Sequence, residues 1–366
     1  MRIIFDNIIF WLQRSGGGSV YWSELIKRAD QLRDIEVLFY DQDIPSDNLF
    51  RTHLALGNTR KESLFNLRIR RYISFTKKVQ CKSIFHSSYF RISNSKNAIN
   101  VTTIHDFTTE KFRKGLARWV NFNQKKYAIK KAAGIICISE NTKKDLLFFF
   151  PDTDESKIKV IYNGVSEDFF YIDEDFNIAD KDDRFVNLQN QKYLLYIGHR
   201  TSYKNFNLAI KAAQKFKKEY TFVVVGEKFD RNEKKYISKY FTEDEIILIS
   251  GLQNKELNFL YNKAFALLYP SSYEGFGIPI VEAMKTKCPV IAAHNSSIPE
   301  VAGNAAILIK DIDEEKISDA IHSLFVKEFR NELVEKGIQQ SKRFNWDHTF
   351  RSYIDYYKKL YNESDI

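Results

Sequence analysis

Short apolar runs alternate with longer amphipathic stretches along the whole chain. In the first half, the runs that predict strands are RIIFDNIIF, IEVLFY, SIFHSS, INVTTIH, GIICIS and KIKVIY. In the second half they are KYLLYIG, TFVVVG, EIILISG, FALLYP, PVIAA and AAILI. Stretches with helical spacing of apolar residues separate several of these runs, for example 20–33 and 205–220. This alternation predicts an α/β fold with parallel sheets and right-handed crossovers.

The two sets of strands predict two doubly wound domains, for which 366 residues are sufficient. Residues 166–191 are polar and acidic, and they predict a linker between a first domain over 1–165 and a second over 192–343. The last segment, 344–366, has aromatic and apolar residues at helical spacing and predicts a terminal helix. Ligands of such sheets bind at the carboxyl ends of the strands. If the two domains face each other, we expect the ligands between them.

The composition indicates a globular protein, with 44% hydrophobic and 28% charged residues. No apolar run approaches the roughly 20 residues needed to cross a bilayer. The first residues, 1–14, are interpreted as a strand rather than a signal peptide because Asp6 and Asn7 interrupt them. Three scattered cysteines favour reduced thiols in a cytoplasmic protein over disulfides or a zinc site.

The net charge of +9 favours an anionic partner. Nucleotide-linked substrates, nucleic acid and acidic lipid surfaces are all candidates on this ground. Two basic stretches, 60–82 and 111–131, mix aromatic and aliphatic residues with Lys and Arg. Such stretches can contact an anionic membrane surface or nucleic acid. The alternative is a solvated helix face of a basic protein.

The stretch YEGFGIPIVEAM, residues 273–284, lies between two predicted strands and predicts a loop followed by a helix. Pro279 suits the first helical turn, and Gly275 and Gly277 allow close approach of a ligand to the backbone. The helix N-terminus then offers free N–H groups and a partial positive charge to a phosphate.

Two acids bracket this helix start. Glu282 falls about one turn into the helix, where a carboxylate can accept from both ribose hydroxyls. Glu274 lies on the loop, where it could bind hydroxyls of a second part of the ligand. The alternative is that both acids complement the helix dipole on a solvated loop.

A basic turn follows the predicted strand that ends at Gly198. His199, Arg200 and Lys204 come directly before the next predicted helix. An arginine and a lysine at the carboxyl end of a strand suit a diphosphate, whose charge they would neutralise as it leaves. A solvated basic turn is the alternative.

Two further strand ends carry candidate residues. SGGGS, 15–19, could approach a phosphate or a sugar, but Tyr21 stands where the dinucleotide fingerprint needs glycine. TTIHD, 102–106, ends in His105, which could contact a polar substrate or assist proton transfer. The alternative is a satisfied histidine at a strand end, followed by an Asp that caps a helix.

Taken in order along the chain, these motifs resemble the retaining GT-B glycosyltransferases of family 4, and among them polysaccharide mannosyltransferases. The resemblance rests on the E-x7-E spacing of Glu274 and Glu282, the glycine loop, the His-Asp strand end and the Gly-His-Arg…Lys-Asn turn. SENTKKDL and VIYNGV, at 139–146 and 160–165, add to it. Many relatives have Arg directly after the glycine, where this chain has His199.

The resemblance implies two facing Rossmann-like domains, with the C-terminal helix crossing back to the first. It also implies a nucleotide-sugar donor on the second domain and an acceptor on the first. No metal and no other cofactor are expected, because cationic groups are present without an evident metal site. By matching position, Lys204 and either Arg200 or His199 would bind the diphosphate, Glu282 would bind the ribose, and Glu274 would bind the donor sugar. The backbone of Phe276, Gly277 and Ile278 would contact the sugar or the phosphates. His105 would contact the transferred sugar, and Gly17 and Gly18 would lie near the phosphates or the acceptor.

The expected reaction is metal-independent transfer with retention, in which the acceptor attacks from the face that the diphosphate leaves. GDP-mannose is the first donor expected, with UDP- and dTDP-sugars still open. The acceptor would be a glycan or a polyprenyl-linked glycan of surface polysaccharide or O-antigen, with the basic stretches at the inner face of an anionic membrane. The alternatives are a sugar-nucleotide epimerase of similar fold, and a protein that binds nucleic acid through its basic helices.

Overall fold

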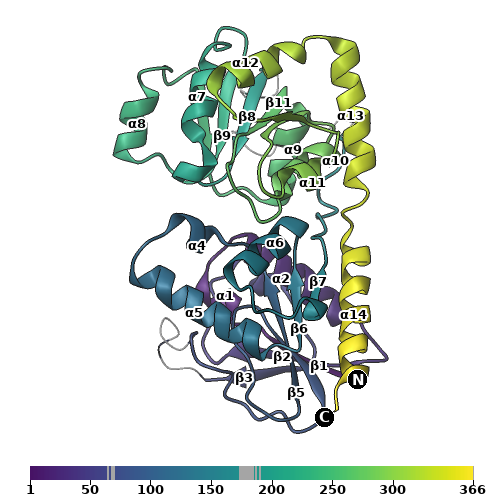
Figure 1. Cartoon of the computed structure of the whole chain (residues 1–366). Coiled ribbons are helices and arrows are strands. Elements are labelled where there is room, and N and C mark those ends of the chain that lie inside the picture. Colours follow the sequence, from purple (N-terminus) through teal and green to yellow (C-terminus); the bar gives the residue numbers. More distant parts are fainter. Residues whose placement is uncertain (64–65, 67–70, 173–184, 186–187, 189–190, 366) are drawn as a thin grey trace. The chain divides into compact units, whose positions relative to one another are not determined.

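A computed structural model describes residues 1–63, 66, 71–172, 185, 188 and 191–365. The chain divides into two compact units (Figure 1). Unit 1 comprises Met1–Gly164 together with Trp346–Ile366, and unit 2 comprises Val165–Asn345. Most of the expected linker, 166–191, lies outside the described residues.

Unit 1 contains a seven-stranded parallel sheet with the order β3-β2-β1-β4-β5-β6-β7. The strands are β1 (Arg2–Asp6), β2 (Glu36–Gln42), β3 (Thr59–Glu62), β4 (Ser83–Ser87), β5 (Ala98–Ile104), β6 (Gly134–Cys137) and β7 (Ile158–Val160). The helices are α1 (Ile9–Leu12), α2 (Gly17–Ala29), α4 (Thr108–Phe112), α5 (Leu116–Lys131), α6 (Glu140–Phe149) and α14 (Trp346–Glu363).

Unit 2 contains a six-stranded parallel sheet with the order β10-β9-β8-β11-β12-β13. The strands are β8 (Tyr193–Ile197), β9 (Thr221–Val225), β10 (Ile246–Ile249), β11 (Ala266–Tyr269), β12 (Val290–Ala293) and β13 (Ile307–Ile309). The helices are α7 (Phe206–Gln214), α8 (Arg231–Ile237), α9 (Asn254–Lys263), α10 (Ile278–Lys285), α11 (Ile298–Ala302), α12 (Glu314–Ser323) and α13 (Lys327–Ser341). The predicted parallel α/β architecture is therefore confirmed in both units.

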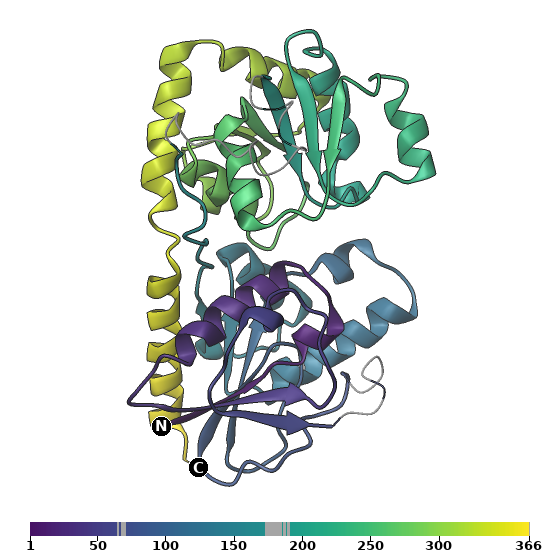
Figure 2. The same ribbon diagram turned by 180° about the vertical axis from the view of Figure 1, so that it is seen from behind.

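The two faces of the unit 1 sheet have different covers. On β1, Ile3 and Phe5 point into a core that α2 and α14 complete, whereas Ile4 points to the opposite face, where Phe75 and Val79 pack. This division follows from the alternation of side chains along a strand. Figure 2 shows that α14, drawn in yellow, ends close to the start of β1, so the two ends of the sequence share one core.

The terminal helix lies very close to the sheet of unit 1. A Cβ added to Gly134 would be 2.4 Å from a methyl carbon of Leu360, and one added to Gly164 would be 2.5 Å from Trp346. Glycine at these two positions therefore permits the close approach of α14. No helix in the described part of the chain is both long enough and apolar enough to cross a bilayer.

The first predicted strand is longer than the observed one. β1 ends at Asp6, and the apolar residues after Asn7 form the short helix α1 instead of continuing the strand. The side chains of Asp6 and Asn7 are buried, and the Asn7 amide donates to the Asp41 carboxylate at 2.9 Å. Polar partners at the sheet edge therefore end the strand where the apolar pattern alone predicted continuation.

Candidate functional site

The loop and helix predicted between two strands of unit 2 are present. β11 leads into a loop, and α10 begins after Gly277, which has a φ of +106°. A side chain at that φ would be strained, and an added Cβ would lie 3.2 Å from Ile280. Pro279 occupies the first turn, where its missing N–H removes no helical hydrogen bond. The start of α10 therefore has the geometry that the sequence predicts for an anion site.

The two charged motifs of unit 2 meet at the sheet edge, because β8 and β11 are neighbouring strands. Lys204 Nζ lies 2.5 Å from Glu274 Oε1, and the two side chains are 14% and 12% exposed. The amide of Asn205 donates to the carbonyl of Pro270 at 2.8 Å and so joins the two loops. Lys204 and Glu274 thus form a cation–carboxylate pair that is confined by the fold but still open to solvent.

Two serines that follow β12 support the loop that carries Glu274. The backbone N–H of Glu274 donates to Ser296 Oγ at 2.8 Å. Ser297 Oγ is within 2.9 Å of the carbonyl oxygens of both Glu274 and Phe276, and Ser297 is fully buried. Sequence analysis did not assign a role to these serines, because the contacts require β12 to lie beside β11.

Arg200 has a different environment from Lys204. Its guanidinium forms a two-point ion pair with Glu233, with Nε–Oε1 at 2.7 Å and Nη2–Oε2 at 3.1 Å, and its side chain is 6% exposed. The guanidinium also lies over the ring of Phe229. Its third nitrogen, Nη1, is buried and has no hydrogen-bond partner within the described part of the chain. His199, by contrast, is exposed.

Glu282 lies on α10, and its carboxyl group is enclosed although the residue retains some exposed surface. The Tyr261 hydroxyl of α9 donates to Glu282 Oε2 at 2.8 Å. Burial raises the pKa of Glu282 to about 7, against the opposing effect of the Tyr261 hydrogen bond. Glu282 therefore changes charge near neutral pH. Of the other residues predicted to contact the donor, Phe276 in the loop before α10 is buried, and Ile278 at the start of α10 is half-buried.

The predicted site residues of unit 1 lie after β5 and at the start of α2. The His105 ring meets the Tyr21 ring edge-on, with the centroids 4.6 Å apart. Burial lowers the pKa of His105 to about 4; the Asp106 charge opposes this shift, and Lys125 adds to it. His105 is therefore neutral at pH 7. Asp106 accepts from the N–H of Thr108, the first residue of α4, at 2.9 Å, although the N-cap position itself is Phe107.

Gly17 and Gly18 are the first residues of α2. A Cβ added to Gly17 would meet no atom within 4 Å, and one added to Gly18 would lie 3.4 Å from the Gln13 amide nitrogen. The helix start is therefore open at Gly17. Gly17, Gly18 and His105 belong to unit 1, and the other predicted site residues belong to unit 2.

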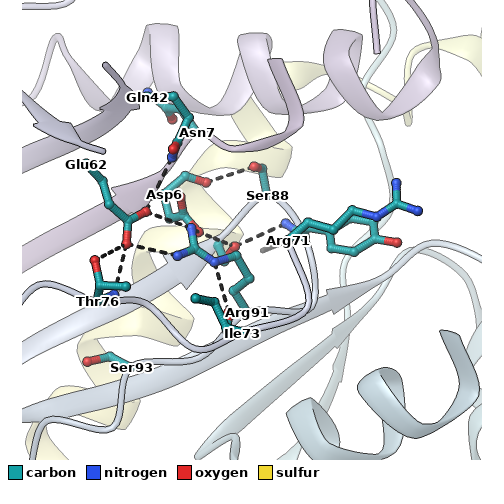
Figure 3. Close-up of polar contacts among 12 residues, drawn as sticks. Asp6, Asn7, Gln42, Glu62, Arg71, Ile73, Thr76, Ser88, Arg91 and Ser93 are labelled. Atoms are coloured by element: carbon teal, nitrogen blue, oxygen red, sulfur yellow. Dashed lines mark hydrogen bonds and ion pairs between the residues drawn. The ribbon is translucent and has the colours of Figure 1, made fainter. Parts of the chain in front are cut away.

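Unit 1 also contains a buried ionic cluster that sequence analysis missed (Figure 3). Arg91 donates to Asp6 and to both carboxylate oxygens of Glu62, at 2.9 Å in each case, and all three side chains are inaccessible to solvent. The backbone N–H and the hydroxyl of Thr76 also donate to the Glu62 carboxylate. Burial raises the pKa of Asp6 to about 6, although the Arg91 charge lowers it. The cluster joins the ends of β1 and β3 to the segment after β4.

Sequence comparison assigns both units to known families. The model of "Glycosyltransferase Family 4" matches residues 15–169, and that of "Glycosyl transferases group 1" matches 179–342. O-antigen chain mannosyltransferase RfbU of Salmonella typhimurium is 27% identical over 67% of this chain and 68% of its own length. O-antigen chain mannosyltransferase B of Escherichia coli is 32% identical over 46% of each chain.

Solved structures with the same fold cover almost the whole chain. Anabaena Alr3699/HepE, solved in complex with UDP-glucose, has a TM-score of 0.74 at 16% identity and covers 97% of this chain and 98% of its own. WaaG, a glycosyltransferase involved in lipopolysaccharide biosynthesis, has a TM-score of 0.68 at 14% identity, covering 97% and 99%. The fold class is therefore GT-B. With both sequence models matched, the chain belongs to glycosyltransferase family 4 and is a glycosyltransferase.

Proposed function

We propose that the chain transfers a hexose from a nucleotide-sugar donor bound by unit 2 to a glycan or polyprenyl-linked glycan bound by unit 1. Mannose from GDP-mannose is the first candidate, because two relatives are named O-antigen chain mannosyltransferases. The proposed setting is the assembly of a surface polysaccharide. The observation that carries this proposal is the Lys204–Glu274 pair beside the start of α10.

Each group of the site has a part in the proposed binding of the donor. Lys204 and the α10 N-terminus would neutralise the diphosphate. Glu274, released from Lys204, would accept from hydroxyls of the sugar, and Glu282 would accept from the ribose. Backbone groups of Phe276, Gly277 and Ile278 would face the sugar or the phosphates. On unit 1, His105 would contact the transferred sugar as a neutral donor or acceptor, and the open turn at Gly17 would approach the phosphates or the acceptor.

Arg200 and His199 could each provide a second cation for the diphosphate, and the two side chains differ in their present contacts. Arg200 already holds Glu233 through Nε and Nη2, whereas His199 is exposed and forms no ion pair with the residues that the structure describes. Of the three Arg200 guanidinium nitrogens, Nη1 alone has no partner among the described residues. Because Nη1 is buried, an anion would reach it only if the surrounding side chains moved, and Nε and Nη2 would then keep Glu233. We assign this contact to Arg200 Nη1.

The proposed reaction retains the anomeric configuration and needs no metal. The bond between the anomeric carbon and the diphosphate oxygen breaks, and an acceptor oxygen bonds to the same face of that carbon. The acceptor proton passes to the departing diphosphate, whose charge Lys204 and the α10 N-terminus stabilise. No carboxylate nucleophile is required, in contrast to double displacement.

We also propose that the corner between α4 and α5 contacts an anionic membrane at its inner face. Residues 111–118 are all exposed, and they combine Lys and Arg with Phe112 and Leu116. Cations with apolar side chains between them suit an anionic lipid surface. Co-sedimentation with anionic vesicles, but not with neutral ones, is the expected result.

The test of the catalytic proposal begins with thermal-shift screening of GDP, UDP, dTDP and ADP, followed by transfer assays with the matching sugar nucleotides. We expect one nucleoside diphosphate to stabilise the protein, and its sugar nucleotide to yield a product with the anomeric configuration of the donor with EDTA present. Absence of nucleotide binding would overturn the proposed function. Activity that EDTA abolishes and manganese restores would overturn the metal-independent reaction, and an epimerised sugar nucleotide formed without acceptor would indicate an epimerase.

A further inference from the structure

Unit 1 has a small pocket beside α5 that the donor site does not use. Its volume is about 270 Å³. It lies between one face of α5 and two segments on either side of β4, and its lining includes Tyr72, Ile73, Phe90, Arg91, Trp119, Asn123, Gln124 and Tyr127. Pockets for drug-sized ligands span about 300–1,000 Å³, so this pocket suits a ligand the size of one sugar ring.

The pocket is aromatic at its rim. Trp119 is 64% exposed and Tyr127 is 43% exposed, and they lie two helical turns apart on the same face of α5. A single exposed apolar side chain is common in globular proteins, but exposed apolar side chains that gather at one pocket mark a binding site. The apolar C–H face of a pyranose is a suitable partner, because its carbon-bound hydrogens can pack against the face of an aromatic ring.

The inner wall of the pocket does not favour a charged ligand. Arg91 lies there, but Asp6 and Glu62 neutralise its guanidinium and its side chain is not exposed (Figure 3). Among the described residues of this wall, the charged groups are already paired with one another, so a charged ligand would find no unpaired counter-charge there. A neutral ligand is favoured on electrostatic grounds.

The polar groups of α5 favour a ligand with hydroxyls. Gln124 Nε2 donates to the carbonyl of Arg71 at 2.8 Å, which fixes the orientation of this amide. Gln124 is only 9% exposed, and its buried Oε1 accepts no hydrogen bond from the residues that the structure describes. A ligand O–H could donate to this oxygen. Asn123, one position before it, also lines the pocket, and its Nδ2 donates to the carbonyl of Trp119 at 2.8 Å.

We propose that this pocket binds one neutral pyranose of the acceptor glycan, with its C–H face on Trp119 and a hydroxyl donating to Gln124. This inference rests on the proposed function, in which unit 1 holds the acceptor. It assigns Trp119 to sugar binding, whereas Leu116, which is 75% exposed one turn earlier on α5 and lines no part of the pocket, belongs to the proposed membrane contact.

Saturation-transfer NMR on the full chain tests the proposal, with methyl α-D-mannopyranoside, methyl α-D-glucopyranoside and N-acetylglucosamine as probes. Loss of an aromatic contact corresponds to about a three- to tenfold loss of affinity, so we expect Trp119→Ala to weaken the bound-sugar signal by that factor. Trp119→Phe should restore part of it. Leu116→Ala, on the same helix, should leave the signal unchanged. In the transfer assay, Trp119→Ala should raise KM for the acceptor without changing KM for the donor.

The outcomes separate this inference from the proposed function. If no probe gives a signal with the wild-type chain, or if Trp119→Ala and Leu116→Ala weaken it equally, the sugar pocket is wrong. If Trp119→Ala instead loses binding to anionic vesicles and leaves the sugar signal intact, Trp119 contacts lipid and the proposal is also overturned. Failure of nucleotide binding on unit 2, with sugar binding preserved, would overturn the catalytic proposal alone.

Discussion

The chain uses the pairing of a cation with a carboxylate in two very different ways. In unit 1, Arg91 is inaccessible and shares its hydrogen bonds between Asp6 and Glu62. In unit 2, Lys204 has a single carboxylate partner, Glu274, and both side chains keep some exposed surface. A buried, multiply bonded pair cannot exchange partners without leaving charges unpaired. A partly open pair can, and so only the second arrangement suits a substrate site.

The largest expected effect is on stability, from Arg91→Met. Removing Arg91 leaves Asp6 and Glu62 buried without a counter-charge, which should cost about 3–5 kcal/mol of unfolding free energy. Urea denaturation followed by circular dichroism would measure the loss. Arg2→Met is the matched control, because the Arg2–Glu36 pair of the same unit is 28% and 48% exposed and should contribute about 0–1 kcal/mol. Equal losses in both variants would show that burial does not distinguish these pairs.

The opposite pattern is expected for Lys204→Ala. Loss of a group that stabilises developing charge typically lowers turnover by about 10²–10³-fold, and we expect this loss in sugar transfer. Stability should fall by less than in Arg91→Met, because Lys204 and Glu274 keep some exposed surface whereas Arg91, Asp6 and Glu62 have none. Lys211→Ala is the control: Lys211 pairs with Glu314 on the same unit, with side chains 38% and 31% exposed, and should retain turnover. If the Lys204→Ala variant were fully active but destabilised, the Lys204–Glu274 pair would have a structural role like that of the Arg91 cluster.

Donor binding should depend on pH through Glu282. The pKa of its carboxyl is raised to about 7, so the residue is mostly neutral at pH 6 and mostly ionised at pH 8. Only the ionised form accepts from both ribose hydroxyls, so affinity for the nucleoside diphosphate should rise with pH over this window, by up to about tenfold. Calorimetric titrations at several pH values would measure it.

Glu282→Gln is the control for that titration, because it keeps the shape and removes the charge. The β-phosphate of the ligand titrates equally in both proteins, so the difference between the two pH profiles reports Glu282. The same raised pKa means that the folded chain binds more protons than the unfolded chain between about pH 4.5 and 7. This contribution to stability is therefore present at low pH and is lost as the pH rises through 7. Parallel profiles for the two proteins would contradict both expectations.

The sequence predicted most of the architecture, because buried parallel strands appear as apolar runs separated by helical spacing. It also placed the basic turn and the E-x7-E loop each at a strand end. It could not predict that Lys204 pairs with Glu274, since this contact depends on β8 lying beside β11. The Arg91 cluster was missed for the same reason: Glu62 stood in a stretch interpreted as a basic surface, and its partner is 29 positions away.

Local pattern was also misleading for the basic stretch at 111–131. Its charges suggested one solvated or lipid-facing surface, but Lys125 is buried against Glu110, with Nζ 2.8 Å from Oε1. Only the first part, 111–119, is exposed throughout. Charge counting along a helix cannot separate these two groups, because the side that faces the sheet is set by the neighbouring elements and not by the local sequence.

The smallest expected effect concerns a buried network of neutral groups in unit 1, which extends the comparison beyond charges. The Tyr353 hydroxyl of α14 lies 2.6 Å from that of Tyr21, whose ring packs against His105. Tyr353→Phe should cost about 1 kcal/mol of unfolding free energy, the typical net contribution of one hydrogen bond. The low pKa of His105 should persist, because burial is its main cause. NMR titration of the His105 ring would measure this pKa.

The control is Tyr356→Phe on the same helix, which removes a 2.6 Å hydrogen bond from the Tyr356 hydroxyl to the Lys157 carbonyl. A rise of the His105 pKa toward 6.5 in Tyr353→Phe alone would show that the hydroxyl network, rather than burial, keeps this histidine neutral.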